Sequence, residues 1–182
     1  MNLADDDAPA KQVQLEQFVV FRLGGEVYAV PILAVTEVVL TLDITPVPNA
    51  PDYILGLTNL RGKIVPVLDL EKKFNLNLDV QVAHRHIMVA QSKQKVLFGI
   101  LVDEVTEVLK VPPDAIKPSP EMVMTKISAE YLGGVIVLAE GQQREADERM
   151  VLILNLERIL SDKNIEELHA VQGSDQLVAS SG

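Results

Sequence analysis

An internal repeat constrains the fold of this chain of 182 residues more than any other feature of its sequence. The tetrapeptide Val-Thr-Glu-Val occurs at residues 35–38 and again at residues 105–108, 70 positions later. Further matches follow in the same order, at spacings of 70, 78 and 86 residues: Val19 with Val89, Tyr28 with Phe98, Ala29 with Gly99, Val30 with Ile100, Val39 with Leu109, residues 53–56 with 131–134, and residues 65–71 with 151–157. This colinear series predicts one supersecondary unit of roughly 65 to 75 residues that is built twice, with extra residues in two loops of the second copy.

Each copy contains about five short strands with turns at regular spacing, which is typical of a small β-barrel. In the first copy we expect strands at residues 18–23, 26–30 and 42–47, a short helical or irregular piece at residues 31–38, and a closing hairpin. The predicted fold is therefore all-β: two packed, five-stranded β-barrels with short helices and a C-terminal helix.

The domain organisation follows from the repeat and from the polar ends of the chain. We expect one domain at residues 16–168, with lobes at about residues 16–80 and 81–160 that can exchange strands. The acidic leader at residues 1–15 and the polar tail at residues 169–182 are predicted to be disordered.

A shared apolar seam should join the two lobes. A barrel of about 70 residues buries only about 60% of its unfolded surface and is marginal alone. The apolar runs at residues 96–102 and 151–154 do not alternate cleanly, so we expect both faces of these strands to be buried. Near the C-terminus, apolar residues share one side of a predicted helix or broken pair of helices, with Ser161 as a candidate N-cap: Leu156, Ile159, Leu160, Ile165 and Leu168.

Composition excludes several classes of partner. The net charge is −10 and the isoelectric point is about 4.7. This field repels nucleic acid and anionic lipid, so neither is expected as a partner. No apolar run approaches the ~18 residues of a membrane span, and the acidic residues 1–7 do not form a signal peptide. Without cysteine the chain has no disulfides or thiolate metal sites, and we expect a cytoplasmic protein.

The hairpin predicted at residues 56–70 contains an unexpected charge. Asn59 and Gly62 are expected to supply the backbone freedom that a tight turn needs. Nothing local requires the guanidinium of Arg61 between two core strands. Two interpretations stay open: a solvated turn residue, or a planar, always-charged fork held against a carboxylate or directed at a partner.

The same hairpin carries a family resemblance. Asn-Leu-Arg-Gly at residues 59–62, followed by Ile-Val-Pro-Val-Leu-Asp-Leu at residues 64–70, resembles the signature of the CheW-like domain. The resemblance covers roughly residues 16–160 and includes Tyr-Leu-Gly-Gly at residues 131–134. It implies two five-stranded β-barrels packed side by side. It also implies a non-enzymatic adaptor, without a cofactor, that couples the cytoplasmic tip of chemoreceptors to the histidine kinase CheA.

The resemblance further implies a set of receptor-binding residues in a groove between the lobes: Val35, Glu37, Gly56, Asn59, Arg61, Gly62, Gly99 and Gly133. In this set Arg61 would pair with Glu37, and the glycines would let a receptor helix approach closely. A separate barrel end would meet the regulatory domain of CheA. The protein would be a monomer in isolation and a member of membrane-associated receptor arrays in complex, with no direct membrane insertion.

Other functions stay open beside the chemotaxis adaptor. The acidic leader, the charged segment 140–149 and the tail leave open an adaptor of a parallel chemosensory pathway, such as pilus motility or surface sensing. A regulatory lobe cut from a kinase would have the same fold, but the start at Met1 favours a separate protein. A small β-barrel enzyme or ligand-binding protein would require a deep pocket with convergent polar groups.

Catalytic and metal-binding chemistry is not predicted. His84 and His86 would share a strand face, but with His169 as the remaining histidine and no cysteine we expect no metal site. Asp103 and Glu104 are expected to be solvated turn residues. The Gly-Gly pairs at residues 24–25 and 133–134 lack the context of a phosphate-binding loop, and no catalytic motif is present.

Overall fold

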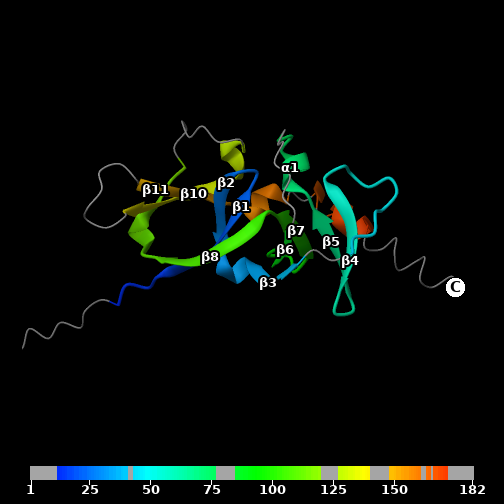
Figure 1. Cartoon of the computed structure of the whole chain (residues 1–182), viewed down its shortest axis with the longest axis horizontal. Coiled ribbons are helices and arrows are strands. Elements are labelled where there is room, and N and C mark those ends of the chain that lie inside the picture. Colours follow the sequence, from blue (N-terminus) through cyan, green and yellow to red (C-terminus); the bar gives the residue numbers. More distant parts are fainter. Residues whose placement is uncertain are drawn as a thin grey trace, which may run out of the picture.

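The computed structural model describes residues 12–40, 43–76, 85–119, 127–139, 148–160, 163–164 and 166–171. These residues form a six-stranded sheet, on the left of Figure 1, and a five-stranded sheet, on the right. The six-stranded sheet has the order β8-β1-β2-β11-β10-β9, with β1 (Glu16–Leu23), β2 (Glu26–Pro31), β8 (Glu104–Val111), β9 (Ile116–Lys117), β10 (Leu132–Ala139) and β11 (Glu148–Leu154). The five-stranded sheet has the order β3-β6-β7-β5-β4, with β3 (Val35–Leu40), β4 (Ile54–Leu60), β5 (Lys63–Leu68), β6 (His86–Gln91) and β7 (Leu97–Val102). This confirms the mainly β fold with two sheets, whereas closure of each sheet into a barrel stays a prediction.

Short helices fill several of the connections between strands. They are η1 (Ile32–Ala34), α1 (Leu70–Lys73), η2 (Pro113–Ala115), η3 (Ala129–Tyr131) and α2 (Leu156–Ile159). Residues 163–164 and 166–171 are also helical. Within the described parts of the chain, no helix has the length and apolar character needed to cross a lipid bilayer.

Each sheet combines strands from both copies of the repeat. The β1–β2 hairpin of the first copy joins β8 to β11 of the second copy, whereas the β6–β7 hairpin of the second copy joins β3, β4 and β5 of the first. Each hairpin makes one of its joins through an antiparallel strand pair, β1 with β8 or β6 with β3, and the other through a parallel pair. Ala29 on β2 lies opposite Ile153 on β11, and Gly99 on β7 lies opposite Val67 on β5. Because the repeat relates these pairs, the two sheets are built on one plan.

Local geometry confirms the equivalence of the later matches. Gly56 and Gly134 have φ angles of 149° and 148°, and each lies at a register shift before a hairpin. After the hairpins, the side chain of Asp69 accepts the backbone N–H of Lys72 and caps α1. Asn155 caps α2 in the same way. A short polar side chain at this position is a typical N-cap.

The first strands of the two copies match one residue differently from the predicted alignment. Val19 lies opposite Val30, and Met88 lies opposite Ile100. Because Val30 is equivalent to Ile100, the counterpart of Val19 is Met88 and not Val89. The predicted pairing of Val19 with Val89 is therefore wrong. The loop between β6 and β7 is longer than the two-residue turn between β1 and β2. Equivalent residues of the two first strands are therefore one position closer in the sequence than equivalent residues of the two second strands.

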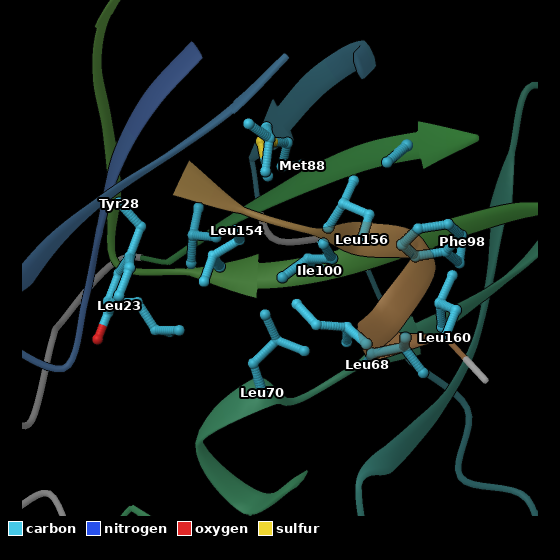
Figure 2. Close-up of a cluster of buried hydrophobic side chains, with 14 of the residues drawn as sticks. Leu23, Tyr28, Leu68, Leu70, Met88, Phe98, Ile100, Leu154, Leu156 and Leu160 are labelled. Carbon is cyan, nitrogen blue, oxygen red and sulfur yellow. The ribbon is translucent and has the colours of Figure 1, made fainter. Parts of the chain in front are cut away.

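Three apolar clusters form the core. The largest contains side chains of both sheets, and Figure 2 shows Leu23 and Tyr28 of the six-stranded sheet in the same cluster as Leu68 and Ile100 of the five-stranded sheet. The second cluster lies within the six-stranded sheet, and the third lies within the five-stranded sheet. Strands such as β1 therefore bury both faces, as predicted for β7 and β11. The shared cluster is the apolar seam expected between the lobes.

Two local predictions need correction. Of the piece predicted as helical or irregular at residues 31–38, η1 includes only Ile32–Ala34, Pro31 ends β2, and residues 35–38 belong to β3. Where a strand was expected at residues 42–47, the described residues contain a single bridge, from Thr45 to Leu57. That bridge is the counterpart of β9, which pairs with β10. In the first copy, one paired residue, Thr45, therefore stands in the place of this strand among the described residues.

The helical residues near the C-terminus pack on the shared core. Leu156, Ile159, Leu160 and Leu168 are buried there, as predicted, and Val171 joins them. Ser161 and Ile165 lie outside the described residues.

A polar cluster connects this helical segment to the part of the molecule that contains the five-stranded sheet. The Tyr53 hydroxyl donates to the carboxylate of Glu167 and accepts from Asn164 Nδ2 at 2.7 Å. Lys73 Nζ donates to Asn164 Oδ1 at 2.9 Å and lies 4.3 Å from the centre of the Tyr53 ring. Burial raises the pKa of the Tyr53 hydroxyl and lowers the pKa of the Lys73 amine. The hydrogen bond from Tyr53 is the main reason that the pKa of Glu167 is lowered.

Candidate functional site

The β4–β5 hairpin presents Arg61 at a tight turn. Leu60 pairs with Lys63, so Arg61 and Gly62 are the two turn residues. Their φ angles are 52° and 84°, and two successive positive values are typical of a type I′ turn. The turn therefore takes its left-handed backbone from Arg61 and Gly62, and the prediction that Asn59 supplies it is wrong. Asn59 belongs to β4, and its Oδ1 accepts the backbone N–H of Gly62 at 2.8 Å.

The expected pair of Arg61 and Glu37 is present. Arg61 Nη2 lies 3.1 Å from Glu37 Oε2, and the two side chains are 80% and 22% exposed. Glu37 projects from β3 on the half-buried side of the strand, as do Val35 and Val39. The carboxylate is therefore held, while most of the guanidinium faces solvent. An exposed ion pair of this kind contributes less than about 1 kcal/mol to stability, and the exposed donors of Arg61 can bind a further acceptor.

Two of the glycines expected in the groove serve the fold itself. A Cβ at Gly56 would lie 2.2 Å from the carbonyl oxygen of Thr45, and a Cβ at Gly99 would lie 2.6 Å from Cγ2 of Ile87. Both residues are buried. Gly133, in contrast, is exposed, and its nearest neighbour would be at an ordinary 3.5 Å. Glycine at positions 56 and 99 is therefore explained by packing within this chain, because atoms of the chain occupy the place of a side chain.

Apolar side chains are exposed on β3 and on β8, although the sequence patterns did not predict their exposure. On β3, Val38 and Leu40 are 38% and 69% exposed, and on β8 Val108 is 48% exposed. Val38 and Val108 are the last residues of the two Val-Thr-Glu-Val segments. Each strand is the edge of its sheet. Successive side chains of a strand point to opposite faces, and valine occurs on both faces here. The sequence pattern could therefore have shown that some of these valines face solvent.

A hollow of about 540 Å³ lies where the two lobes meet. Its apolar lining includes Phe18 and Ile153 of the six-stranded sheet and Leu33 of η1. Lys93 and Lys95 from the β6–β7 loop also line it. Leu33 is 97% exposed. Gly133 contributes to the lining, and it is the one predicted glycine that faces this space.

Asp103 is not the solvated turn residue that the sequence predicts. It lies between β7 and β8 and is only 7% exposed. Its Oδ2 accepts the backbone N–H of Gly24 at 2.8 Å, and its Oδ1 lies 3.6 Å from Nε of Arg85. Glu104, the next residue, is exposed as expected.

Within the described residues, no three histidine or carboxylate side chains are placed to hold a metal ion. His86 lies on β6, and His169 is exposed. His84 lies outside the described residues.

Comparison with known proteins identifies the family. Residues 17–164 match the CheW-like domain. The chain belongs to the CheW-like domain family. This CheW-like chain is 36% identical over 150 residues to the chemotaxis protein CheW of Klebsiella aerogenes, covering 82% of this chain and 84% of the relative. It is 30% identical over 159 residues to protein FrzA of Myxococcus xanthus, covering 87% of this chain and 94% of FrzA.

A solved structure supports the same assignment. The scaffolding protein TtCheW of Thermoanaerobacter tengcongensis aligns with this CheW-like chain at a TM-score of 0.68 and 31% identity. The alignment covers 82% of this chain and 90% of TtCheW.

Proposed function

We propose that this CheW-like chain is a non-enzymatic scaffold of chemotaxis signalling that holds a chemoreceptor tip and the histidine kinase CheA in one complex. The observation that carries the proposal is the Arg61–Glu37 pair at the exposed β4–β5 turn, in a chain whose relatives include chemotaxis proteins CheW. A charged fork and apolar anchors are features of a binding surface.

The receptor face centres on Arg61 and Glu37, with the half-buried Val35 and Val39 on the same side of β3. Val38 and Leu40 are exposed on the opposite side of that strand. Arg61 offers exposed guanidinium donors whose position the pair with Glu37 fixes. We infer that the receptor presents a helix with apolar residues spaced along one side and a carboxylate that Arg61 reaches, because a helix laid on an apolar surface is a recurring mode of recognition.

The kinase contacts a different surface. We infer that one end of a lobe meets the CheW-like regulatory domain of CheA, sheet end to sheet end. Because the two domains share a fold, such head-to-tail contacts can alternate and close into rings. Each contact would be small, nearer about 1,200 Å² than the size of an obligate interface, and the array would supply avidity.

Arg61→Asn tests the receptor face without disturbing the turn. Asparagine tolerates the left-handed backbone at this position and forms the favoured Asn-Gly type I′ turn. We expect the affinity for a receptor tip fragment, measured by isothermal titration calorimetry, to fall at least about tenfold, which corresponds to about 1.4 kcal/mol.

Lys63→Gln is the matched control, because Lys63 is an exposed residue next to the same turn and takes no part in the ion pair. Its affinity for the receptor fragment should stay at the parent level. An Arg61→Asn variant that binds with unchanged affinity would contradict the assignment of Arg61.

A scaffold of a parallel chemosensory pathway is the second candidate. One relative, 30% identical with 94% of its length covered, is named protein FrzA rather than chemotaxis protein CheW, so a second pathway is retained as a candidate. Pull-down of the full chain with receptor tip fragments from each chemosensory system of the same organism distinguishes the two. Selective capture of receptors outside the chemotaxis system would assign the chain to the parallel pathway.

A further inference from the structure

The repeat places two equivalent junctions between the sheets, and they differ in chemistry. By the alignment of the copies, Gly24, Glu71, Arg85 and Asp103 in one junction correspond to Lys93, Glu157, Glu16 and Leu33 in the other. We call the first group the polar junction and the second group the open junction.

The polar junction connects the two sheets through one buried carboxylate. Asp103 Oδ2 accepts the N–H of Gly24, in the β1–β2 turn of the six-stranded sheet, at 2.8 Å. Asp103 Oδ1 lies 3.6 Å from Nε of Arg85, which immediately precedes β6 of the five-stranded sheet. The backbone N–H of Asp103 also donates to the carbonyl of Arg22 at 3.0 Å. One residue therefore contacts both sheets.

Glu71 completes the polar junction. Arg85 Nη2 lies 3.2 Å from each oxygen of Glu71, and Glu71 belongs to α1, directly after β5. The side chains of Glu71, Arg85 and Asp103 are 13%, 22% and 8% exposed. Because these charges are largely removed from water, their geometry is constrained more strongly than that of a surface pair.

The open junction has no equivalent buried charge at its central position. Leu33 stands where Asp103 stands in the polar junction, and Leu33 is 97% exposed. Glu16, at the position of Arg85, lines the hollow of about 540 Å³. The backbone N–H of Lys93 donates to Glu157 Oε1 at 2.8 Å in an exposed position.

We propose that the polar junction fixes the angle between the two sheets, whereas the open junction constrains that angle much less. Asp103, Arg85 and Glu71 are then positioning residues that set the angle between the lobes. The shared apolar core resists separation, but the hydrophobic effect has no preferred direction and fixes the angle less well. Buried ionic networks often contribute little net stability, which fits a role in specifying an arrangement. The proposal concerns the sheets alone and does not depend on which partners bind.

The absence of cysteine makes the test direct, since two introduced cysteines carry the only spin labels. Thr36→Cys on β3 and Lys110→Cys on β8 place one label on each sheet at exposed positions. Double electron–electron resonance then measures the distribution of distances between the sheets in the full chain. In the labelled parent we expect a single narrow distribution. Glu71→Gln, and more strongly Arg85→Met, should broaden it at least about twofold, as expected when a hinge is loosened.

Glu157→Gln is the matched control, because Glu157 is the counterpart of Glu71 in the open junction. It should leave the width unchanged. Thermal unfolding followed by circular dichroism checks that each variant is folded, and a folded variant with a broader distribution separates positioning from stability. If Arg85→Met does not fold, the width measured for Glu71→Gln tests the proposal by itself. This substitution keeps the shape of the side chain and leaves the hydrogen bond from Gly24 to Asp103 in place. Equal widths in the parent and Glu71→Gln, or equal broadening by Glu157→Gln, would overturn the proposal.

Discussion

Arg61 occupies a backbone region that most residues with a side chain avoid. Its φ of 52° is uncommon for any residue except glycine, asparagine and aspartate. The exposed ion pair with Glu37 contributes less than about 1 kcal/mol to the free energy of unfolding. A position that costs backbone energy and gains little in stability is more easily explained by binding than by folding.

The first prediction concerns the stability of Arg61 variants. Arg61→Ala should lower the free energy of unfolding by less than about 1 kcal/mol, because only an exposed ion pair is lost. Arg61→Asn should leave it unchanged or raise it by up to about 0.5 kcal/mol, because asparagine suits the turn. Urea unfolding followed by circular dichroism measures both. A loss of several kcal/mol in Arg61→Asn would mean that Arg61 is a structural residue.

The second prediction contrasts two glycines. Gly56→Ala should destabilise the fold by about 3 kcal/mol or more, since the new Cβ would lie 2.2 Å from the carbonyl of Thr45 at a φ of 149°. Gly133→Ala should change stability by less than about 0.5 kcal/mol, because its Cβ finds ordinary contact distances. Thermal melts of the two variants provide the test. Similar melting temperatures would contradict the packing described at Gly56.

At this scale the sequence alone predicts the existence of the turn but not its contacts. The pairing of Arg61 with Glu37 followed from the family resemblance, because no local spacing joins β3 to the β4–β5 hairpin. The burial of Asp103 could not be predicted, since its partner Gly24 is 79 residues away in sequence. The identity of a residue shows that its side chain is polar, but contacts with residues distant in sequence decide whether that side chain is exposed to solvent.

The helical segment near the C-terminus joins the five-stranded lobe through both apolar and polar contacts. Leu168 and Val171 enter the shared core, and the polar cluster around Tyr53 lies beside them. The hydroxyl of Tyr53 contacts Glu167 and Asn164 of this segment. The segment is thus part of the folded unit rather than an appended tail.

The third prediction concerns the pH dependence of this contact. The lowered pKa of Glu167 means that the ionised form is favoured in the folded state. Its contribution is therefore present above the ordinary value of 4.5 and is lost as the pH falls through the lowered folded value. The melting temperature of Glu167→Gln should differ from that of the parent at neutral pH, and the difference should shrink in acid.

Tyr53→Phe is the companion variant to Glu167→Gln. Removal of one partly buried hydroxyl should cost about 1 kcal/mol at neutral pH. If the difference in melting temperature between the parent and Glu167→Gln grew as the pH fell, the lowered pKa assigned to Glu167 would be contradicted.

The repeat predicted most elements, because matched residues in two copies reinforce each other. It allowed an exchange of strands between the lobes, but it could not predict that the β1–β2 and β6–β7 hairpins are the parts exchanged. A hairpin shows which strands pair within it, whereas the parallel contacts of Ala29 with Ile153 and of Gly99 with Val67 depend on the whole fold. The prediction of a short helical or irregular piece at residues 31–38 is confirmed only for Ile32–Ala34, because residues 35–38 pair with β6 as part of β3.

On the scale of the whole molecule, the shared core makes the two sheets interdependent. Residues of both sheets contribute to the largest cluster, as Figure 2 shows for Tyr28 and Phe98. The exchanged hairpins reinforce this dependence, since neither sheet is complete without strands from both copies of the repeat. We therefore expect the sheets to unfold together.

The fourth prediction tests this dependence. Leu68→Ala, at a fully buried position of the shared core, should lower the free energy of unfolding by about 2–5 kcal/mol. The transition should remain single, with the same midpoint by far-ultraviolet circular dichroism and by tyrosine fluorescence. Leu40→Ala, at a position 69% exposed, is the control and should change stability little. Two separate transitions in Leu68→Ala would show that the lobes fold independently.

The central claim is that one scaffold carries two separate surfaces, one for a receptor and one for the kinase. The most direct measurement is calorimetric titration of a receptor tip fragment into the full chain that has first been saturated with the regulatory domain of CheA. We predict that the receptor fragment binds the saturated chain as well as it binds the free chain, and that Arg61→Asn weakens receptor binding while kinase binding is unchanged. Competition between the two partners, or no binding of either, would contradict the account.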